Sequence, residues 1–152
     1  MKDLSLHILD IVENSIRAEA NRVEISVVEN EEKDMLTLKI EDNGKGMKKE
    51  ILSRAAQPFF TSKLGRRVGM GLALLAQAAR EANGKFEIAS TPETGTRIKA
   101  TFLYSHPDRK PLGDIAATLE TLIVGNPGVD FIYEHRIGGT STRFDTREVV
   151  KL

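Results

Sequence analysis

The chain has 152 residues, of which 40% are apolar, and its 22 basic residues balance its 22 acidic ones, so the formal net charge is zero. This composition is ordinary for one globular domain with a sizeable core, and it gives no global sign of a nucleic-acid partner or an anionic membrane surface. Cysteine is absent, which excludes disulfides and thiolate chemistry, and the apolar runs are too short to span a bilayer.

The first elements in chain order are a helix and two strands. Residues 1–7 lack the apolar core of a signal peptide, so we expect a cytoplasmic protein without membrane association. Apolar residues recur at helical spacing over 4–18, which predicts an amphipathic helix that ends before Asn21. Alternating apolar residues at 23–27 and 36–40 predict two strands joined by a charged turn.

The middle of the chain begins with a glycine-rich segment at 42–47. A short helix at 48–54 and a basic loop at 56–69 are expected next. The Ala- and Leu-rich stretch 70–82 predicts a second long helix, with Asn83-Gly84 as its C-cap.

Two further strands are predicted at 86–88 and 97–103, joined by a turn at Thr94-Gly95. The composition then changes at 105–111, where two prolines and several charges indicate a connector. We therefore expect a first unit at 1–104.

The remaining residues, 105–152, form a predicted C-terminal extension. It contains a helix at 113–124 and two strands at 129–137 and 140–150, which flank the hairpin signal Gly138-Gly139. We expect the extension to pack on the same domain and add strands to its sheet; a dimer or partner surface is the alternative.

The first chemical motif lies on the first helix. Asp10, Asn14 and Arg17 are spaced by four and three residues, so they share one face. An amide oxygen there suits Mg²⁺, which prefers oxygen ligands and keeps water and phosphate as additional ligands. A solvated helix face is the simpler interpretation of this motif taken alone.

The second motif combines Asp42 with Gly44 and Gly46 at the end of a strand. A carboxylate there can accept a hydrogen bond from an amino group such as adenine N6, and glycines let the backbone approach a flat ligand. An ordinary Asn-Gly turn explains the same residues.

Two later motifs suit phosphate. Residues 58–63 (Pro-Phe-Phe-Thr-Ser-Lys), with Arg66 and Arg67, offer hydroxyls and cations on a loop that could close over a ligand. Residues 69–74 (Gly-Met-Gly-Leu-Ala-Leu) open a helix whose free N–H groups attract anions. A basic surface loop and a helix that starts at glycine are the simpler interpretations.

In this order the motifs resemble the GHKL superfamily of gyrase-type topoisomerases, 90-kilodalton heat-shock chaperones, histidine kinases and mismatch-repair ATPases. Asn14 resembles the N box, 42–47 the first glycine motif, 58–63 the lid and 69–74 the second glycine motif, while Gly95-Thr96 resembles the final glycine–threonine motif. The resemblance covers about residues 4–104.

The resemblance implies a Bergerat fold, a two-layer α/β sandwich with helices on one face of a mixed sheet, and it implies ATP and Mg²⁺ as cofactors. Asn14 would be the Mg²⁺ ligand, and Asp42 would bind adenine N6. The implied nucleotide-binding set is Asn14, Arg17, Ala18, Asp42, Gly44, Gly46, Met47, Phe60, Thr61, Lys63, Gly69, Met70, Gly71, Leu72 and Thr96.

The branch of the superfamily decides the expected reaction. The lid and the second glycine motif look like histidine kinases, whereas the first helix also looks like mismatch-repair ATPases. His7, His106 and His135 have no helical-hairpin setting that would suit a phospho-acceptor. Relatives that hydrolyse ATP tend to place a glutamate four residues before the N-box asparagine; here that position is Asp10, with Glu13 as the neighbouring carboxylate.

We therefore expect a histidine-kinase-like domain that acts on a separate protein partner. The alternatives are a nucleotide-gated binding module with little catalysis, a weak ATPase of the mismatch-repair-like branch, and a domain whose motifs are coincidental turns. A homodimer remains open, and no nucleic-acid partner is expected.

Overall fold

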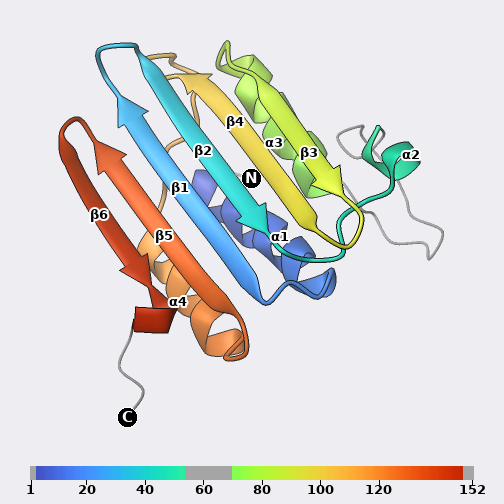
Figure 1. Cartoon of the computed structure of the whole chain (residues 1–152). Coiled ribbons are helices and arrows are strands. Elements are labelled where there is room, and N and C mark those ends of the chain that lie inside the picture. The colour runs from blue at the N-terminus through green and yellow to red at the C-terminus, as the bar shows by residue number, and fades with distance from the viewer. Residues whose placement is uncertain (1–2, 54–69, 149–152) are drawn as a thin grey trace.

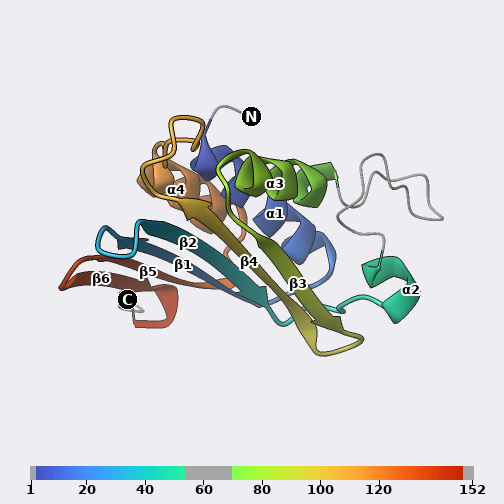
Figure 2. The ribbon, with the colours of Figure 1, turned by 90° about the horizontal axis from the view of Figure 1, so that it is seen from above.

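The computed structural model describes residues 3–53 and 70–148 and arranges them in two layers (Figures 1 and 2). The described elements in chain order are α1 (Leu4–Arg17), β1 (Arg22–Asn30), β2 (Met35–Asp42), α2 (Lys49–Leu52), α3 (Met70–Glu81), β3 (Phe86–Thr91), β4 (Gly95–Leu103), α4 (Ile115–Gly125), β5 (Asp130–Ile137), β6 (Thr140–Asp145) and the 3₁₀ turn η1 (Thr146–Glu148). Within the described residues one mixed sheet has the order β3-β4-β2-β1-β5-β6. Figure 2 shows α1, α3 and α4 on the same face of that sheet, which confirms the expected two-layer sandwich.

The helix α1 has both a start signal and a continuous apolar stripe. Asp3 caps it, because its carboxylate accepts the N–H of Leu6 at 3.1 Å. At the other end Glu19 adopts the left-handed conformation (φ +65°), which turns the chain into β1. The stripe packs against the sheet with exposures of 1% or less at Leu4, Ile8, Ile11 and Val12.

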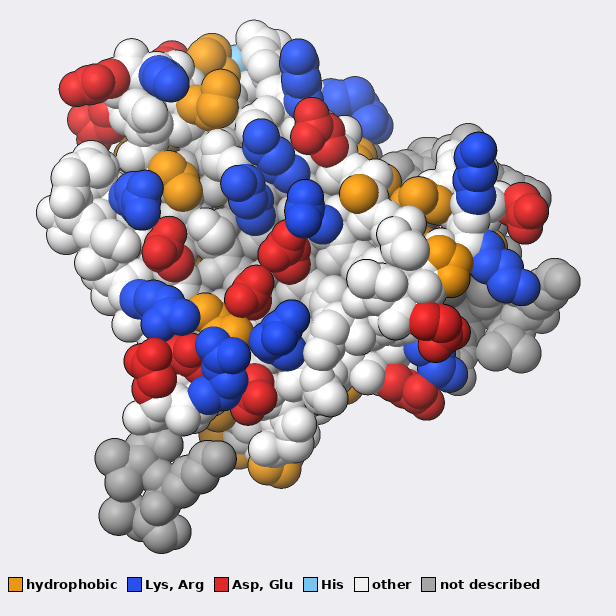
Figure 3. Space-filling view, in the orientation of Figure 1, with side chains coloured by type: hydrophobic (Ala, Val, Ile, Leu, Met, Phe, Trp, Pro, Cys, Tyr) orange, Lys and Arg blue, Asp and Glu red, His pale blue; other side chains and the backbone are white. Residues whose placement is uncertain are grey.

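The central strands alternate between the helix layer and an open face. In β1, Val23, Ile25 and Val27 are 1% exposed or less, whereas the residues between them point away from the helices. Figure 3 looks onto that open face, where basic and acidic side chains are interspersed. One of its ion pairs joins Arg97 of β4 to Glu41 of β2. The helix side of the sheet is therefore the side that holds the apolar core.

The C-terminal residues continue both layers. β5 pairs with β1 in parallel, and β6 pairs with β5 in the antiparallel direction. The helix α4 lies beside α1, where the Thr118 hydroxyl donates to the Ser5 carbonyl at 3.4 Å. The connector is held as well, because the N–H of Leu4 donates to the Pro111 carbonyl at 2.9 Å.

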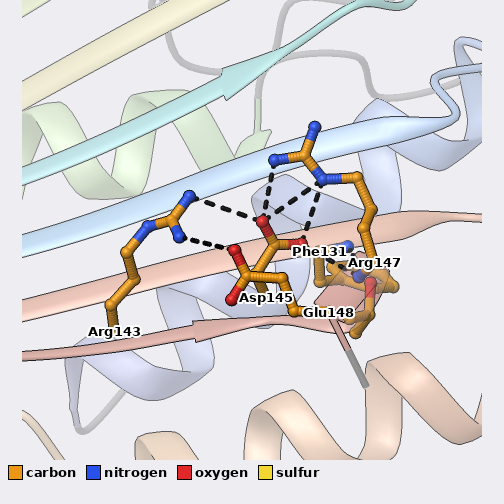
Figure 4. A network of polar contacts seen from close by, with 6 residues as sticks. Phe131, Arg143, Asp145, Arg147 and Glu148 are labelled. Carbon is orange, nitrogen blue, oxygen red and sulfur yellow. Dashed lines mark hydrogen bonds and ion pairs between the residues drawn. The ribbon is translucent and has the colours of Figure 1, made fainter. Parts of the chain in front are cut away.

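A buried carboxylate fastens the end of β6 (Figure 4). Asp145 accepts hydrogen bonds from Arg147 Nη2 at 2.7 Å and Nε at 3.0 Å, and Arg143 lies 3.4 Å away. The hydrogen bonds from Arg147 lower the pKa of Asp145 to about 2. Next to it, the Thr146 hydroxyl accepts the N–H of Phe131 at 2.9 Å.

Several predicted bounds need correction. The strand predicted at 140–150 is wrong over Thr146–Glu148, because the chain turns into η1 there and brings Arg147 back to Asp145; residues 149 and 150 lie outside the described residues. The helix predicted at 48–54 is the four-residue α2, and β4 begins at Gly95, two residues earlier than expected.

The loop predicted at 56–69, with Phe60, Thr61, Lys63 and Gly69, lies outside the described residues. Across 3–53 and 70–148, no helix is both long enough and apolar enough to cross a membrane.

Candidate nucleotide-binding site

Asp42 is the last residue of β2 and lies opposite Thr96 of β4 in the sheet register. Both residues are half-buried. The Asp42 carboxylate is fixed on two sides: its Oδ2 accepts the Ser15 hydroxyl at 2.6 Å, and its Oδ1 accepts the N–H of Gly44 at 2.9 Å. This holds an acceptor for an external donor in one orientation at the end of the sheet.

Two glycines let the loop after Asp42 pass close to its neighbours. A Cβ on Gly44 would lie 2.8 Å from the Ala18 carbonyl oxygen, which also accepts the N–H of Lys45 at 2.8 Å. Gly46 has φ +67°, and a Cβ there would lie 2.0 Å from the Thr91 carbonyl oxygen. The first glycine is needed for close approach to the end of α1, and the second for both its conformation and its packing.

A serine of β3 joins this loop to β4. The Ser90 hydroxyl accepts the N–H of Met47 at 2.8 Å and donates to the Gly95 carbonyl at 3.0 Å. Its oxygen lies 2.8 Å from the Thr96 hydroxyl. Met47 is half-buried and packs against the core. Thr96 and Met47 are thus held by the same side chain.

Ser15 and Ser90 hold the candidate site in place and were not predicted from the sequence, and Asn43 lies within the predicted segment 42–47 but was given no role there. Asn43 accepts the N–H groups of Asn21 and Arg22, each at 3.0 Å, and so fixes the loop to the start of β1. The signal for Ser15 was present, since a hydroxyl on the buried stripe of α1 needs a partner. Ser90 and Asn43 carried no comparable signal.

Asn14 and Arg17 share one face of α1, as their spacing predicted. The Arg17 guanidinium donates to Asn14 Oδ1 at 2.5 Å. Across 3–53 and 70–148, no group of three acidic or histidine side chains could hold a metal. The amide oxygen of Asn14 is of the ligand type that Mg²⁺ prefers, and in this structure it is engaged by Arg17.

Asp10, a residue of α1, lies beside the first turn of α3. A Cβ on Gly71 would fall 1.8 Å from Asp10 Oδ2, so the carboxylate contacts the first turn of that helix. A negative group is favourable there because of the helix dipole. Glu13, in contrast, is exposed. Leu72 is 5% exposed and belongs to the core, so only its backbone is open to a role in binding.

The described residues of the predicted set lie on α1, around the loop after β2 and at the start of α3. α1 carries Asp10, Asn14 and Arg17, and its end contacts the loop after β2. α3 begins beside Asp10 with Met70 and Gly71. Figure 2 shows α1 and α3 next to each other in the helix layer, and the two helices are in contact.

Residues 2–106 match the sequence model of the family described as "Histidine kinase-, DNA gyrase B-, and HSP90-like ATPase". The chain belongs to this family. The match confirms the resemblance inferred from the ordered motifs, and it places all of the motifs within the family region.

Curated relatives of the family include sensor kinases. "Sensor histidine kinase YxdK" of Bacillus subtilis is 30% identical over 109 residues, which cover 67% of this chain and 33% of that protein. "Non-motile and phage-resistance protein" of Caulobacter vibrioides is 35% identical over 89 residues, which cover 55% of this chain and 11% of that protein. The chain thus spans a third or less of the length of these relatives.

A solved structure shows the same fold. The "Aquifex aeolicus MutL ATPase domain complexed with ADP" superposes with a TM-score of 0.63 at 17% identity, covering 95% of this chain and 63% of that one. At this identity the likeness concerns the fold alone. It extends beyond the family match at residue 106, so it includes most of the C-terminal residues.

Proposed function

We propose that this chain binds ATP with Mg²⁺ and acts as a histidine-kinase-like domain on a separate protein partner. The observation that carries the proposal is the Asp42 carboxylate, oriented by Ser15 and Gly44 beside Thr96. A fixed carboxylate accepts the adenine amino group but meets the carbonyl of guanine with repulsion. The site would therefore select adenine nucleotides.

The phosphates would extend from the base toward α1 and α3. The N–H groups at Met70 and Gly71 open α3, and a helix N-terminus suits a phosphate. Asn14 would bind Mg²⁺ once the phosphates attract Arg17 away from its amide oxygen. Ala18 and Gly44 would line the base. A role for Phe60, Thr61, Lys63 and Gly69 in nucleotide binding is implied by the family motifs alone, since these residues lie outside the described part of the chain.

Asp10 is the favoured catalytic carboxylate. It contacts the first turn of α3, where the phosphates would lie, whereas the exposed Glu13 has no described contact with that turn. With Asp10 as the base, a hydroxyl, imidazole or water positioned beside the γ-phosphate would lose its proton to the carboxylate as it attacks. The attacking group would come from the partner, or from water in a weak ATPase.

Calorimetric titration of the full chain with ATP and Mg²⁺ tests the binding. We expect ATP to bind at least about tenfold more tightly than GTP, and Asp42→Asn to weaken ATP binding by about tenfold to a hundredfold, since one hydrogen bond to a charged group is lost. Asp130→Asn is the matched control, because Asp130 is an exposed carboxylate at the start of β5. Equal affinity of Asp42→Asn and the unaltered chain would refute the assignment.

Product analysis with γ-labelled ATP separates the possible reactions. Transfer of label to an added protein supports the kinase, and release of phosphate alone supports the ATPase. We expect Asp10→Asn to retain ATP affinity within about threefold and to lose product formation, while Glu13→Gln keeps both. A chain that binds ATP but forms no product in any combination supports the nucleotide-gated binding module instead.

A further inference from the structure

A groove runs along α4 on the side of the sheet that carries the helices, and β1 separates its strand wall from β2, the strand that ends at Asp42. One wall is α4, and the other is the helix-facing side of β5 and β6, which Figure 1 shows next to α4 at the edge of the sheet. Its volume is about 690 Å³. The side chains that define it are Glu120, Ile123, Val124, Tyr133, His135 and Phe144.

Apolar side chains are exposed on both walls of this α4 groove. Val124 is 75% exposed on the helix side, and Phe144 is 40% exposed on the strand side. Ile137, 46% exposed, continues the row of β5 that contains Tyr133 and His135. These are three of the six large apolar side chains that are exposed in the described part of the chain, and such clustering marks a binding surface.

Two exposed carboxylates line the helix wall of the groove. Asp114 caps α4, where it accepts the N–H of Ala117 at 2.9 Å, and Glu120 lies on the helix itself. Among the described residues no lysine or arginine lines the groove. Asp114 and Glu120 are six residues apart, or about 9 Å along the helix. A ligand with basic groups at a similar separation would be attracted.

The strand wall of the groove is held in place by contacts with the carboxylate of Glu29. His135 Nε2 lies 2.5 Å from Glu29 Oε2, and the Tyr104 hydroxyl donates to Glu29 Oε1 at 2.9 Å. Glu29 is buried, and its carboxylate links Tyr104, directly after β4, to His135 of β5. Burial also raises the pKa of Tyr133 to about 12, so this residue remains a neutral wall at ordinary pH. A wall that is fixed before binding lowers the entropic cost of association.

The edge of the sheet does not favour an added strand. β6 has only six residues, and its Arg143 is engaged with Asp145 and Glu148. Short edges that carry charged side chains oppose strand pairing. The apolar surface instead follows α4, whose 11 residues span about 16 Å, or three helical turns.

We propose that the α4 groove binds an amphipathic helix of a partner protein. This helix would place apolar side chains at positions i, i+4 and i+7 between Val124 and Phe144, and basic side chains beside Asp114 and Glu120. A second copy of this chain fits less well, because the two acidic pairs would face each other. None of the groove residues belongs to the nucleotide site, so this proposal and the proposed ATP binding can fail independently.

Fluorescence anisotropy with designed peptides tests the proposal on the full chain. The probe is a labelled helix of about 15 residues with a leucine stripe and lysine flanks, and its matched partner carries glutamate in place of each lysine. We expect the lysine peptide to bind at least about tenfold more tightly than the glutamate peptide, Val124→Arg to weaken it by at least about tenfold, and Glu120→Lys to reverse the preference. Met35→Arg is the control, because Met35 is a 41%-exposed apolar residue on β2, away from the groove.

Four results would overturn it. The first is that the two peptides bind equally well, and the second is that Val124→Arg binds the lysine peptide as tightly as the unaltered chain does. The third is that the chain associates with itself and Val124→Arg abolishes this association. The fourth is that neither peptide binds, while a small apolar probe such as indole binds the groove. The third result would assign the surface to a second copy, and the fourth to a small molecule.

Discussion

Replacing His7 by leucine should remove about 1 kcal/mol of the loss of stability that this chain suffers between pH 7 and pH 5. His7 lies on the buried stripe of α1 with 2% of its surface exposed, and its Nδ1 has no hydrogen-bond partner among the described residues. Burial lowers the pKa of His7 from 6.5 to about 4. A neutral imidazole is therefore required in the folded chain, whereas the unfolded chain takes up a proton as the pH falls through 6.5.

The size of the effect follows from these two pKa values. Stability is complete above pH 6.5 and declines as the pH falls toward 4, where the folded chain is protonated as well. Between pH 7 and pH 5 the linkage amounts to about 1.8 kcal/mol at full weight. Relaxation of the folded chain and water penetration around a protonated imidazole reduce this value, so we expect about 1 kcal/mol.

Urea unfolding at pH 7 and pH 5 measures the effect. His7→Leu should lose at least about 0.5 kcal/mol less than the unaltered chain over this interval, and at pH 7 it should be at least as stable, because no buried nitrogen remains unsatisfied. His106→Gln serves as the control, since His106 is only partly buried in the connector. Equal losses in His7→Leu and the unaltered chain, or an NMR titration of His7 near 6.5, would refute the reasoning.

Two more predictions concern the C-terminal network and the loop after β2. Asp145→Asn should be less stable than the unaltered chain above pH 4, and the difference should shrink as the pH falls toward 2, because the carboxylate beside Arg147 keeps its charge down to about that pH. Thermal unfolding from pH 5 to pH 2 measures this difference in stability. A difference that does not change with pH would contradict the prediction. Gly46→Ala should lower the free energy of unfolding in urea by about 2 kcal/mol or more, since a Cβ there would overlap the Thr91 carbonyl. Gly138 also has a positive φ but lies in open space, so Gly138→Ala should cost only about 1 kcal/mol. Similar losses in the two variants would show that the overlap at Gly46 is relieved.

The helices and the central strands could be predicted because they depend on local sequence patterns. The spacing of Leu4, Ile8 and Ile11 is a property of the helix itself, so α1 was predicted to within a residue at its end. The hairpin at Gly138-Gly139 was equally local. The parallel pairing of β5 with β1 was not accessible in this way, because it joins Arg22 to Asp130 across more than a hundred residues and leaves no periodic signal. The sequence therefore indicated that residues 105–152 add strands to the sheet, but not which strand they would pair with.

The end of β6 shows how a side-chain contact overrides local preference. Residues 140–150 contain enough β-branched residues to predict one long strand. The bidentate contact of Arg147 with the buried Asp145 requires the chain to turn immediately after the carboxylate. An isolated sequence segment cannot reveal which arginine will meet which carboxylate, so the bound was set at the wrong residue.

The candidate site has the same division between local and distant causes. Asp42 and Gly46 could be predicted because strand end, carboxylate and glycine follow one another in sequence. The groups that orient them could not, since Ser15 lies 27 residues before Asp42 and Ser90 lies 43 residues after Met47. These two serines tie the loop to α1 on one side and to the β3–β4 hairpin on the other. In the proposed nucleotide complex, a ligand that moves the Asp42 carboxylate would act through Ser15 on α1, the helix that carries Asp10 and Asn14. Binding of the base would in this way affect the residues proposed to meet the phosphates.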